Sequence, residues 1–195
     1  DRAMSAFSSW GVTPDLKLKP EITGVGGNIY STRDQGLSGS NYGNMSGTSM
    51  ASPQVAGAIT VLTQYLRTNH KENYQSEEEL RHLAANLLMS TATQIHETDV
   101  EYSPRLQGAG LVNLMDAVAA GAYLTNPDAA ENRPKGEMGD DDRKQGVFTF
   151  PFEIHNMSEE VKQYTFDSSV MTLISELATV RVYFFFIKRS SKSIF

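Results

Sequence analysis

Residues 44–57, which read NMSGTSMASPQVAG, decide the fold of this chain. From this stretch onward, apolar residues recur at intervals of three and four, which is the spacing of one face of an α-helix. The helix is expected to begin at Ser49 and to end near Thr68. Its apolar positions are Val55, Ile59, Leu62 and Leu66. A serine therefore stands at the first turn of a long helix.

The start of a helix gives the Ser49 hydroxyl a defined chemical setting. The first amides of a helix have no intrahelical acceptor and lie at the positive end of its dipole, so they can stabilise an oxyanion formed by attack of Ser49 on a carbonyl. Gly47 lets the backbone turn tightly, and Pro53 lacks an amide that the first turns do not need. The residues alone leave a second interpretation open, in which Ser49 or Thr48 is an ordinary N-cap.

Two other serine nucleophile motifs do not fit the stretch. Ala51 stands where the nucleophile elbow of an α/β-hydrolase has glycine, and Ser52 stands where a Ser-x-x-Lys motif has lysine. The spacing therefore indicates a candidate nucleophile without assigning a reaction class.

The flanking segments predict further elements. Residues 1–47 are rich in Gly, Ser, Thr and Asn and are typical of strands and loops, with an extended stretch at 28–32. Ser76 and Glu79 form a capping box before an apolar stripe, which predicts an amphipathic helix over 77–89. Asn113 is expected to cap a short helix that ends near residue 121.

The composition changes after residue 124. Residues 125–145 contain prolines, glycines and an acidic run, which indicates a solvated linker. Beyond it, residues 147–150 and 161–166 are apolar and β-branched around a turn, as in antiparallel strands. We therefore expect one domain over 1–124, a linker over 125–145 and an incomplete β domain over 146–195.

Residues 44–57 closely resemble the nucleophile signature of the subtilisin family of serine proteases. Residues 7–11 and 19–22 before the signature, and residues 108–113 after it, resemble further blocks of that family in the same order. The resemblance covers residues 1–122. Gln54 and Val25 depart from the residues that many relatives carry, but neither belongs to the triad.

The resemblance implies an α/β fold: the C-terminal part of a three-layer α/β/α domain with a mostly parallel sheet, followed by the start of a β-sandwich. It makes Ser49 the catalytic nucleophile of a serine endopeptidase that acts on polypeptides. It also places the triad Asp and His, and an oxyanion-hole Asn, upstream of residue 1, so the upstream half of the same domain is an expected partner. Met45 and Ser46 are expected on the leaving-group side of the cleft. The histidines follow Ser49 and are not expected to be the base; they are His70, His82, His96 and His155.

Residues 8–20 resemble, more particularly, the lactocepin-type cell-envelope proteinases of Gram-positive bacteria. These are large secreted enzymes in which a domain of fibronectin type III character follows the protease. The resemblance implies an extracellular protein, either secreted or associated with the cell wall, and it agrees with a β domain after residue 146.

Composition argues against several other classes. The formal charge of −6 and the lack of a Lys/Arg-rich stripe argue against a nucleic-acid partner. No apolar run approaches the length of a membrane helix, and cysteine is absent. Glu137 and residues 140–142 lack the alternating spacing of a calcium loop, so neither a metal nor another cofactor is expected.

Two rival functions remain open at this stage. A non-catalytic surface or adhesion protein could retain a protease-like scaffold without its base. An esterase of the α/β-hydrolase type is disfavoured, because its Asp and His follow the serine in the chain. For the chain on its own, without the upstream half, we expect apolar residues of the two long helices to be exposed, namely Val55, Leu62, Leu83 and Leu87.

Overall fold

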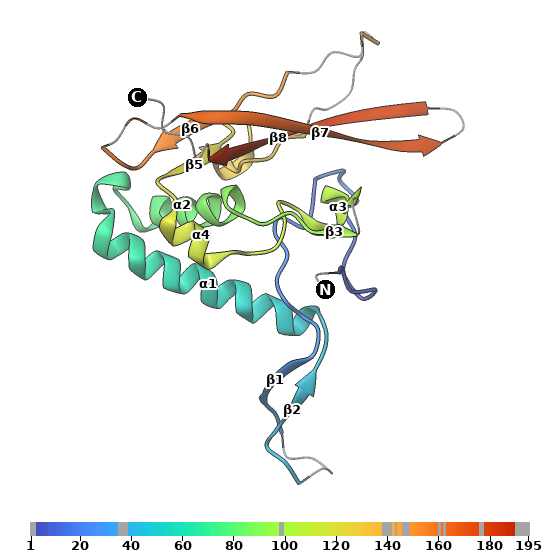
Figure 1. Ribbon diagram of the computed structural model, residues 1–195, viewed down its shortest axis with the longest axis vertical. Coiled ribbons are helices and arrows are strands. Elements are labelled where there is room, and N and C mark those ends of the chain that lie inside the picture. Colours follow the sequence, from blue (N-terminus) through green and yellow to red (C-terminus); the bar gives the residue numbers. More distant parts are fainter. Residues whose placement is uncertain are drawn as a thin grey trace. The chain divides into compact units, whose positions relative to one another are not determined.

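The computed structural model describes residues 3–34, 39–97, 100–137, 142, 144–145, 149–159, 161, 163–175 and 178–189. The chain divides into two compact units, residues 1–157 and 158–195. The first unit contains both helices and strands, so the α/β class predicted from the sequence is confirmed. Figure 1 shows the helices and strands in chain order.

Three helices form the centre of the first unit. They are α1 (Thr48–Asn69), α2 (Glu77–Ser90) and α4 (Leu114–Ala119), and shorter helical turns stand at α3 (Pro104–Gln107), Lys71–Asn73 and Ala130–Asn132. The helices predicted over 49–68, 77–89 and 114–121 are thereby confirmed.

The predicted caps of α2 and α4 also form. The Ser76 hydroxyl accepts a hydrogen bond from the Glu79 amide at 3.1 Å, and the Glu79 carboxylate accepts one from the Gln75 amide at 2.7 Å. The Asn113 side chain accepts from the Asp116 amide at 3.1 Å. Each cap satisfies an amide that the helix itself leaves without an acceptor.

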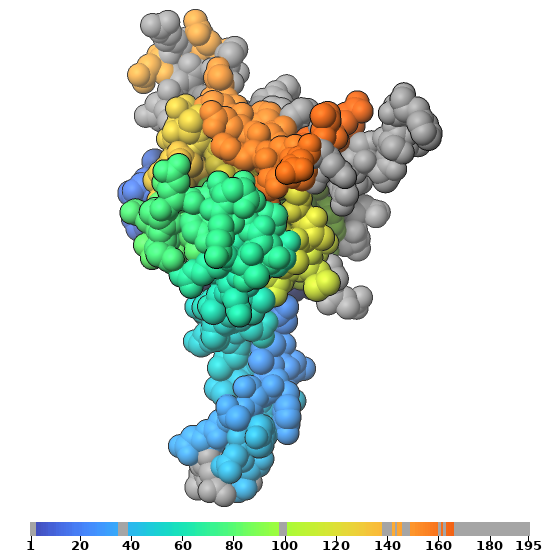
Figure 2. Space-filling model, turned by 90° about the vertical axis from the view of Figure 1, so that its left-hand side faces the viewer, coloured from blue at the N-terminus to red at the C-terminus, as the bar shows by residue number. Residues whose placement is uncertain are grey.

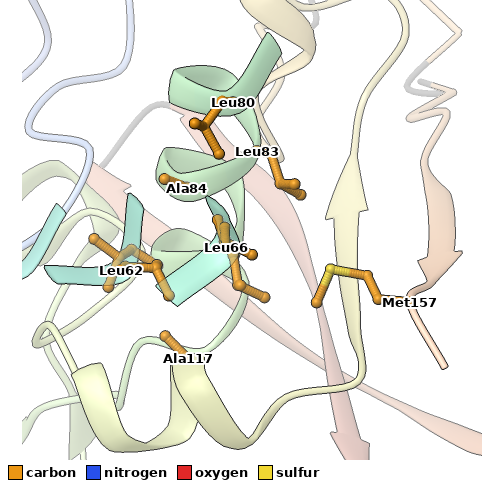
Figure 3. Close-up of a cluster of buried hydrophobic side chains, with 9 residues drawn as sticks. Leu62, Leu66, Leu80, Leu83, Ala84, Ala117 and Met157 are labelled. Carbon is orange, nitrogen blue, oxygen red and sulfur yellow. The ribbon is translucent and has the colours of Figure 1, made fainter. Parts of the chain in front are cut away.

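The core of the first unit lies where the C-terminal half of α1 packs on α2 and α4 (Figure 3). Its buried members are Leu62, Leu66, Leu80, Leu83, Ala84, Leu87, Leu88, Ala117 and Met157. The expected exposure of Leu62, Leu83 and Leu87 is therefore wrong, because α1 and α2 bury these side chains against each other and against α4. Val55, nearer the start of α1, remains partly exposed.

Truncation of one core leucine tests this packing. The Leu83 side chain is only 4% exposed, so Leu83→Ala in the intact protein is expected to lower the free energy of unfolding of this domain by about 2–5 kcal/mol. The matched control is Met115→Ala on α4, because Met115 is 77% exposed and its loss should change stability by less than about 0.5 kcal/mol. Urea unfolding measures both, and equal shifts would contradict the assigned core.

The strands of the described residues form antiparallel pairs. In the first unit β1 (Ile29–Thr32) pairs with β2 (Tyr42–Met45), β3 (His96–Glu97) with β4 (Val100–Glu101), and β5 (Ala122–Thr125) with β6 (Glu153–Asn156). A single parallel bridge joins Thr23 to Leu111, and Leu111 also bridges Thr93. The mostly parallel sheet stays a prediction for the complete domain.

The second unit is a long antiparallel hairpin of β7 (Tyr164–Ser175) and β8 (Ala178–Arg189). Its assignment as the start of a β-sandwich stays a prediction, as does the predicted linker. The structure adds that β6 pairs back onto β5 across residues 125–145, so residues 153–156 belong to the first compact unit.

A cluster of charged groups ties part of the predicted linker to residues 18–21. Lys135 Nζ lies 3.1 Å from Glu21 Oε1 and donates a hydrogen bond to the Leu18 carbonyl, while the Glu137 carboxylate accepts one from the Leu18 amide. Burial acts to raise the pKa of Glu21, but hydrogen bonds from Lys19 and Lys135 outweigh it and hold that pKa below its ordinary value. Residues 135–137 are therefore tied to a loop more than a hundred residues earlier in the chain.

Candidate active site

Ser49 is the second residue of α1, and its side chain is exposed. The N-cap of the helix is Gly47, and no side chain makes a capping hydrogen bond. The interpretation of Ser49 or Thr48 as an ordinary N-cap is therefore wrong. Among the residues that the structure describes, the Ser49 hydroxyl has no hydrogen-bond partner. The hydroxyl is thus available to a ligand or to a proton acceptor.

The backbone of the first turn presents amides without acceptors. The Gly47 carbonyl accepts from the amides of Met50 and Ala51 at 3.1 and 3.4 Å. Within the described part of the chain, the amides of Thr48 and Ser49 have no acceptor. At the positive end of a helix of 22 residues, such amides favour negative charge on a bound oxygen. The Ser49 amide is therefore a candidate oxyanion donor.

Two hydrogen bonds, one between backbone groups and one to a side-chain hydroxyl, fix the turn that carries Ser49. The Gly47 amide donates to the Gly26 carbonyl at 2.8 Å, and the Asn28 amide donates to the Ser46 hydroxyl at 2.8 Å. The hairpin β1–β2 leads directly into this turn (Figure 1). Of the two residues expected to touch substrate, Met45 is exposed, whereas the Ser46 hydroxyl is engaged in holding the turn.

Two glycines let residues 24–26 lie against the start of α1. A Cβ added at Gly24 would stand 2.8 Å from the Ala51 carbonyl oxygen and from a methyl of Val55. One added at Gly26 would stand 2.6 Å from the Gly47 carbonyl oxygen. Real Cβ atoms essentially never approach another heavy atom to within 3.0 Å, so a side chain at either position would force its surroundings to shift. Gly24 and Gly26 were not among the residues predicted for the site. The signal was available, because residues two apart lie on one face of an extended segment and glycines there allow another backbone to come close.

None of the four histidines is hydrogen-bonded to Ser49, and all four lie in described residues. His70 follows the far end of α1, about 30 Å from Ser49 at the helical rise of 1.5 Å per residue. The others belong to other elements, α2, β3 and β6, and they are His82, His96 and His155. That the base is none of them stays a prediction.

The acidic run of the predicted linker lies mostly outside the described residues. Asp140 and Asp141 are outside them, and Asp142 is within them. The described residues contain no group of three or more His, Asp or Glu side chains placed to hold a metal ion. No helix of the described part is both long enough and apolar enough to cross a membrane.

Comparison with known families matches residues 1–110 of this chain to the model of the Subtilase family. The match includes Ser49 and the turn before it. It ends at residue 110, next to Leu111, which forms the parallel bridge with Thr23.

Individual relatives extend the similarity beyond that range. The chain is 33% identical over 171 residues to the C5a peptidase of Streptococcus pyogenes serotype M6, covering 87% of this chain and 14% of that protein. It is 36% identical over 178 residues to the PII-type proteinases of Lacticaseibacillus paracasei and of Lactococcus lactis subsp. cremoris, covering 87% of this chain and 9% of each of those proteins. The chain therefore spans a small part of the length of these relatives.

Proposed function

This chain belongs to the subtilase family, and on that premise we propose that Ser49 is the nucleophile of a serine endopeptidase that cleaves polypeptides. The observation that carries the proposal is the setting of Ser49 at the start of α1. Its hydroxyl is exposed and has no partner in the described residues, and its amide has no acceptor at the positive end of the helix. An exposed serine hydroxyl and an oxyanion donor are two of the three parts that acyl transfer through a serine requires, and the third is a general base.

The reaction proceeds through an ester on Ser49. The Ser49 oxygen attacks the carbonyl carbon of the scissile bond while a histidine takes the hydroxyl proton, and the Ser49 amide donates to the resulting oxyanion. The carbon–nitrogen bond then breaks as the same proton passes to the leaving amine. A water molecule attacks the ester, and its hydrolysis restores the Ser49 hydroxyl. The histidine and its aspartate are assigned to an earlier part of the same protease domain, as the resemblance implies.

The substrate class that we propose is polypeptide, and the location is extracellular, secreted or held at the cell wall. The location rests on the resemblance of residues 8–20 to cell-envelope proteinases. The C5a peptidases carry the name of a substrate, but they are only 33% identical to this chain. We therefore assign no individual substrate to it.

Labelling with a fluorophosphonate tests the assignment of the nucleophile. The intact protein is expected to react at Ser49, because the base and the aspartate raise the nucleophilicity of that hydroxyl alone. Mass spectrometry of the digested protein should place the label on the peptide that contains Ser49. Ser49→Ala should abolish the label, and Ser52→Ala, one turn along the same helix and also exposed, should retain it.

Residues 1–195 expressed alone should remain unlabelled, since none of their four histidines is hydrogen-bonded to Ser49. Specific labelling of Ser49 in this chain alone would show that a base lies within it and would contradict the proposed triad. An intact protein that is folded but is neither labelled nor active would instead support a non-catalytic scaffold.

A further inference from the structure

Two tyrosines form an exposed aromatic pair on the hairpin that precedes Ser49. Tyr30 lies in β1 and Tyr42 in β2, with 69% and 53% of their surfaces exposed. Their rings stack with centroids 6.1 Å apart and planes inclined by 20°. The register pairs Tyr30 with Asn44 and Thr32 with Tyr42, so the two tyrosines are diagonal neighbours on one face of the hairpin. We refer to them as the tyrosine pair.

The fold of the first unit does not use the tyrosine pair. Neither residue belongs to the buried core or packs against it, and neither hydroxyl is hydrogen-bonded to another described residue. Single exposed apolar side chains are ordinary, whereas two nearly parallel rings beside each other form one larger aromatic surface. Tyrosine offers an apolar face and a polar edge at little cost in side-chain entropy, and it is enriched at binding surfaces for that reason.

The pair is held in a fixed relation to Ser49. Tyr42 precedes Met45 by three residues of one strand, which is about 10 Å at the rise of a β-strand. The strand then enters the turn that the Gly26 carbonyl and the Ser46 hydroxyl fix by hydrogen bonds. Figure 2 shows this hairpin, in blue and cyan, extending from the end of the first unit at which α1 begins. The site of attack and the aromatic surface are thus parts of one continuous backbone segment.

We propose that the tyrosine pair binds the polypeptide substrate at side chains several residues away from the bond that is cut. The inference rests on the proposed function of Ser49. A segment that lies along β2 advances from Met45 to Tyr42 in about three residues, since extended chains advance about 3.3 Å per residue. The surface of two stacked rings suits proline rings and aromatic side chains, which pack face to face on tyrosine. The pair therefore selects substrates by the side chains that lie several residues away from the cut bond.

The test compares peptide substrates that share the residues around the cut bond. A short peptide ends two residues from that bond on both sides. Four long peptides extend it by six residues: a proline and phenylalanine extension and a glycine and serine extension are each placed on one side of the bond or on the other. The intact enzyme is assayed with Tyr30→Ala/Tyr42→Ala, with Tyr30→Phe/Tyr42→Phe, and with Met115→Ala, which removes an exposed apolar side chain on α4.

The alanine double variant is expected to lower kcat/KM about tenfold for one of the proline and phenylalanine peptides, mainly through KM. The same variant should leave the short peptide and the glycine and serine peptides unchanged. The phenylalanine double variant, which keeps both rings, should stay within about twofold of the wild type for every peptide. Met115→Ala should behave as the wild type.

Three results would overturn the inference. Equal losses for short and long peptides would give the pair a structural role in the hairpin. Unchanged kinetics with every peptide would remove the pair from substrate binding. A change in sedimentation of the alanine double variant without a change in kcat/KM would identify a second copy of the chain as the occupant. Failure of the proposed function is distinguishable, because the wild type would then cleave neither the short nor the long peptides.

Discussion

Ser49→Ala in the intact enzyme is expected to lower kcat by about 10⁶-fold, the scale of loss found when the serine of such a triad is removed. The alanine methyl cannot form the ester on which both halves of the reaction depend. The folded state should be nearly unaffected, because the Ser49 side chain is exposed and makes no hydrogen bond with the described residues. The expected change in unfolding free energy is within about 0.5 kcal/mol.

Steady-state kinetics on a protein substrate measures this prediction, and urea unfolding provides the control for stability. Ser52→Ala is the matched variant, since it removes a second exposed hydroxyl from the same helix. It should retain kcat within about twofold. A Ser49→Ala enzyme with a tenth of the wild-type rate would show that another residue carries the acyl group.

The helices of the first unit could be predicted from the sequence because their signals are local. The capping box at Ser76 and the N-cap at Asn113 act within three residues, and the apolar stripes repeat within each helix. These local patterns do not show which other helices the apolar stripes pack against. Leu62 and Leu83 are buried because α1 and α2 pack against each other. This packing depends on how the chain turns between the two helices.

The pairing of β5 with β6 could not be predicted from the sequence for a related reason. These strands lie on either side of residues 125–145, whose composition indicates a solvated linker. The ion pair of Glu21 with Lys135 joins groups that are more than a hundred residues apart. Composition describes a segment's own tendency to bury surface, and it carries no information on a distant carboxylate that the segment meets after folding.

For the candidate site, the sequence predicts a candidate nucleophile but not the contacts that hold it. Ser49 was assigned from its place at a helix start and from the resemblance of residues 44–57. The close approach of Gly26 to the Gly47 carbonyl and the register that brings Tyr30 beside Tyr42 depend on two segments meeting. The stretch between these segments, at 35–38, lies outside the described residues.

Gly26→Ala is expected to lower kcat by about 100-fold, although residue 26 carries no reacting atom. Its added Cβ would stand 2.6 Å from the Gly47 carbonyl oxygen and 3.3 Å from the Ala51 Cβ. The backbone atoms it meets belong to the turn that positions Ser49, and the Gly47 amide is already bonded to the Gly26 carbonyl. Relief of the clash requires the segment at residue 26 and the start of α1 to move apart. Because the Gly47 amide is bonded to the Gly26 carbonyl, this movement disturbs the turn that positions the Ser49 oxygen and amide.

Gly27→Ala is the matched control, because a Cβ at Gly27 would meet nothing nearer than the Ser5 hydroxyl at 3.8 Å. It should keep kcat within about twofold of the wild type. Circular dichroism at the assay temperature distinguishes a folded enzyme with a displaced nucleophile from an unfolded enzyme. The Gly26→Ala enzyme should remain folded and should react more slowly with the fluorophosphonate. Equal kcat values for the two variants would show that the turn before Ser49 accepts a methyl group, and the contact between residues 26 and 47 would then have no part in positioning the nucleophile.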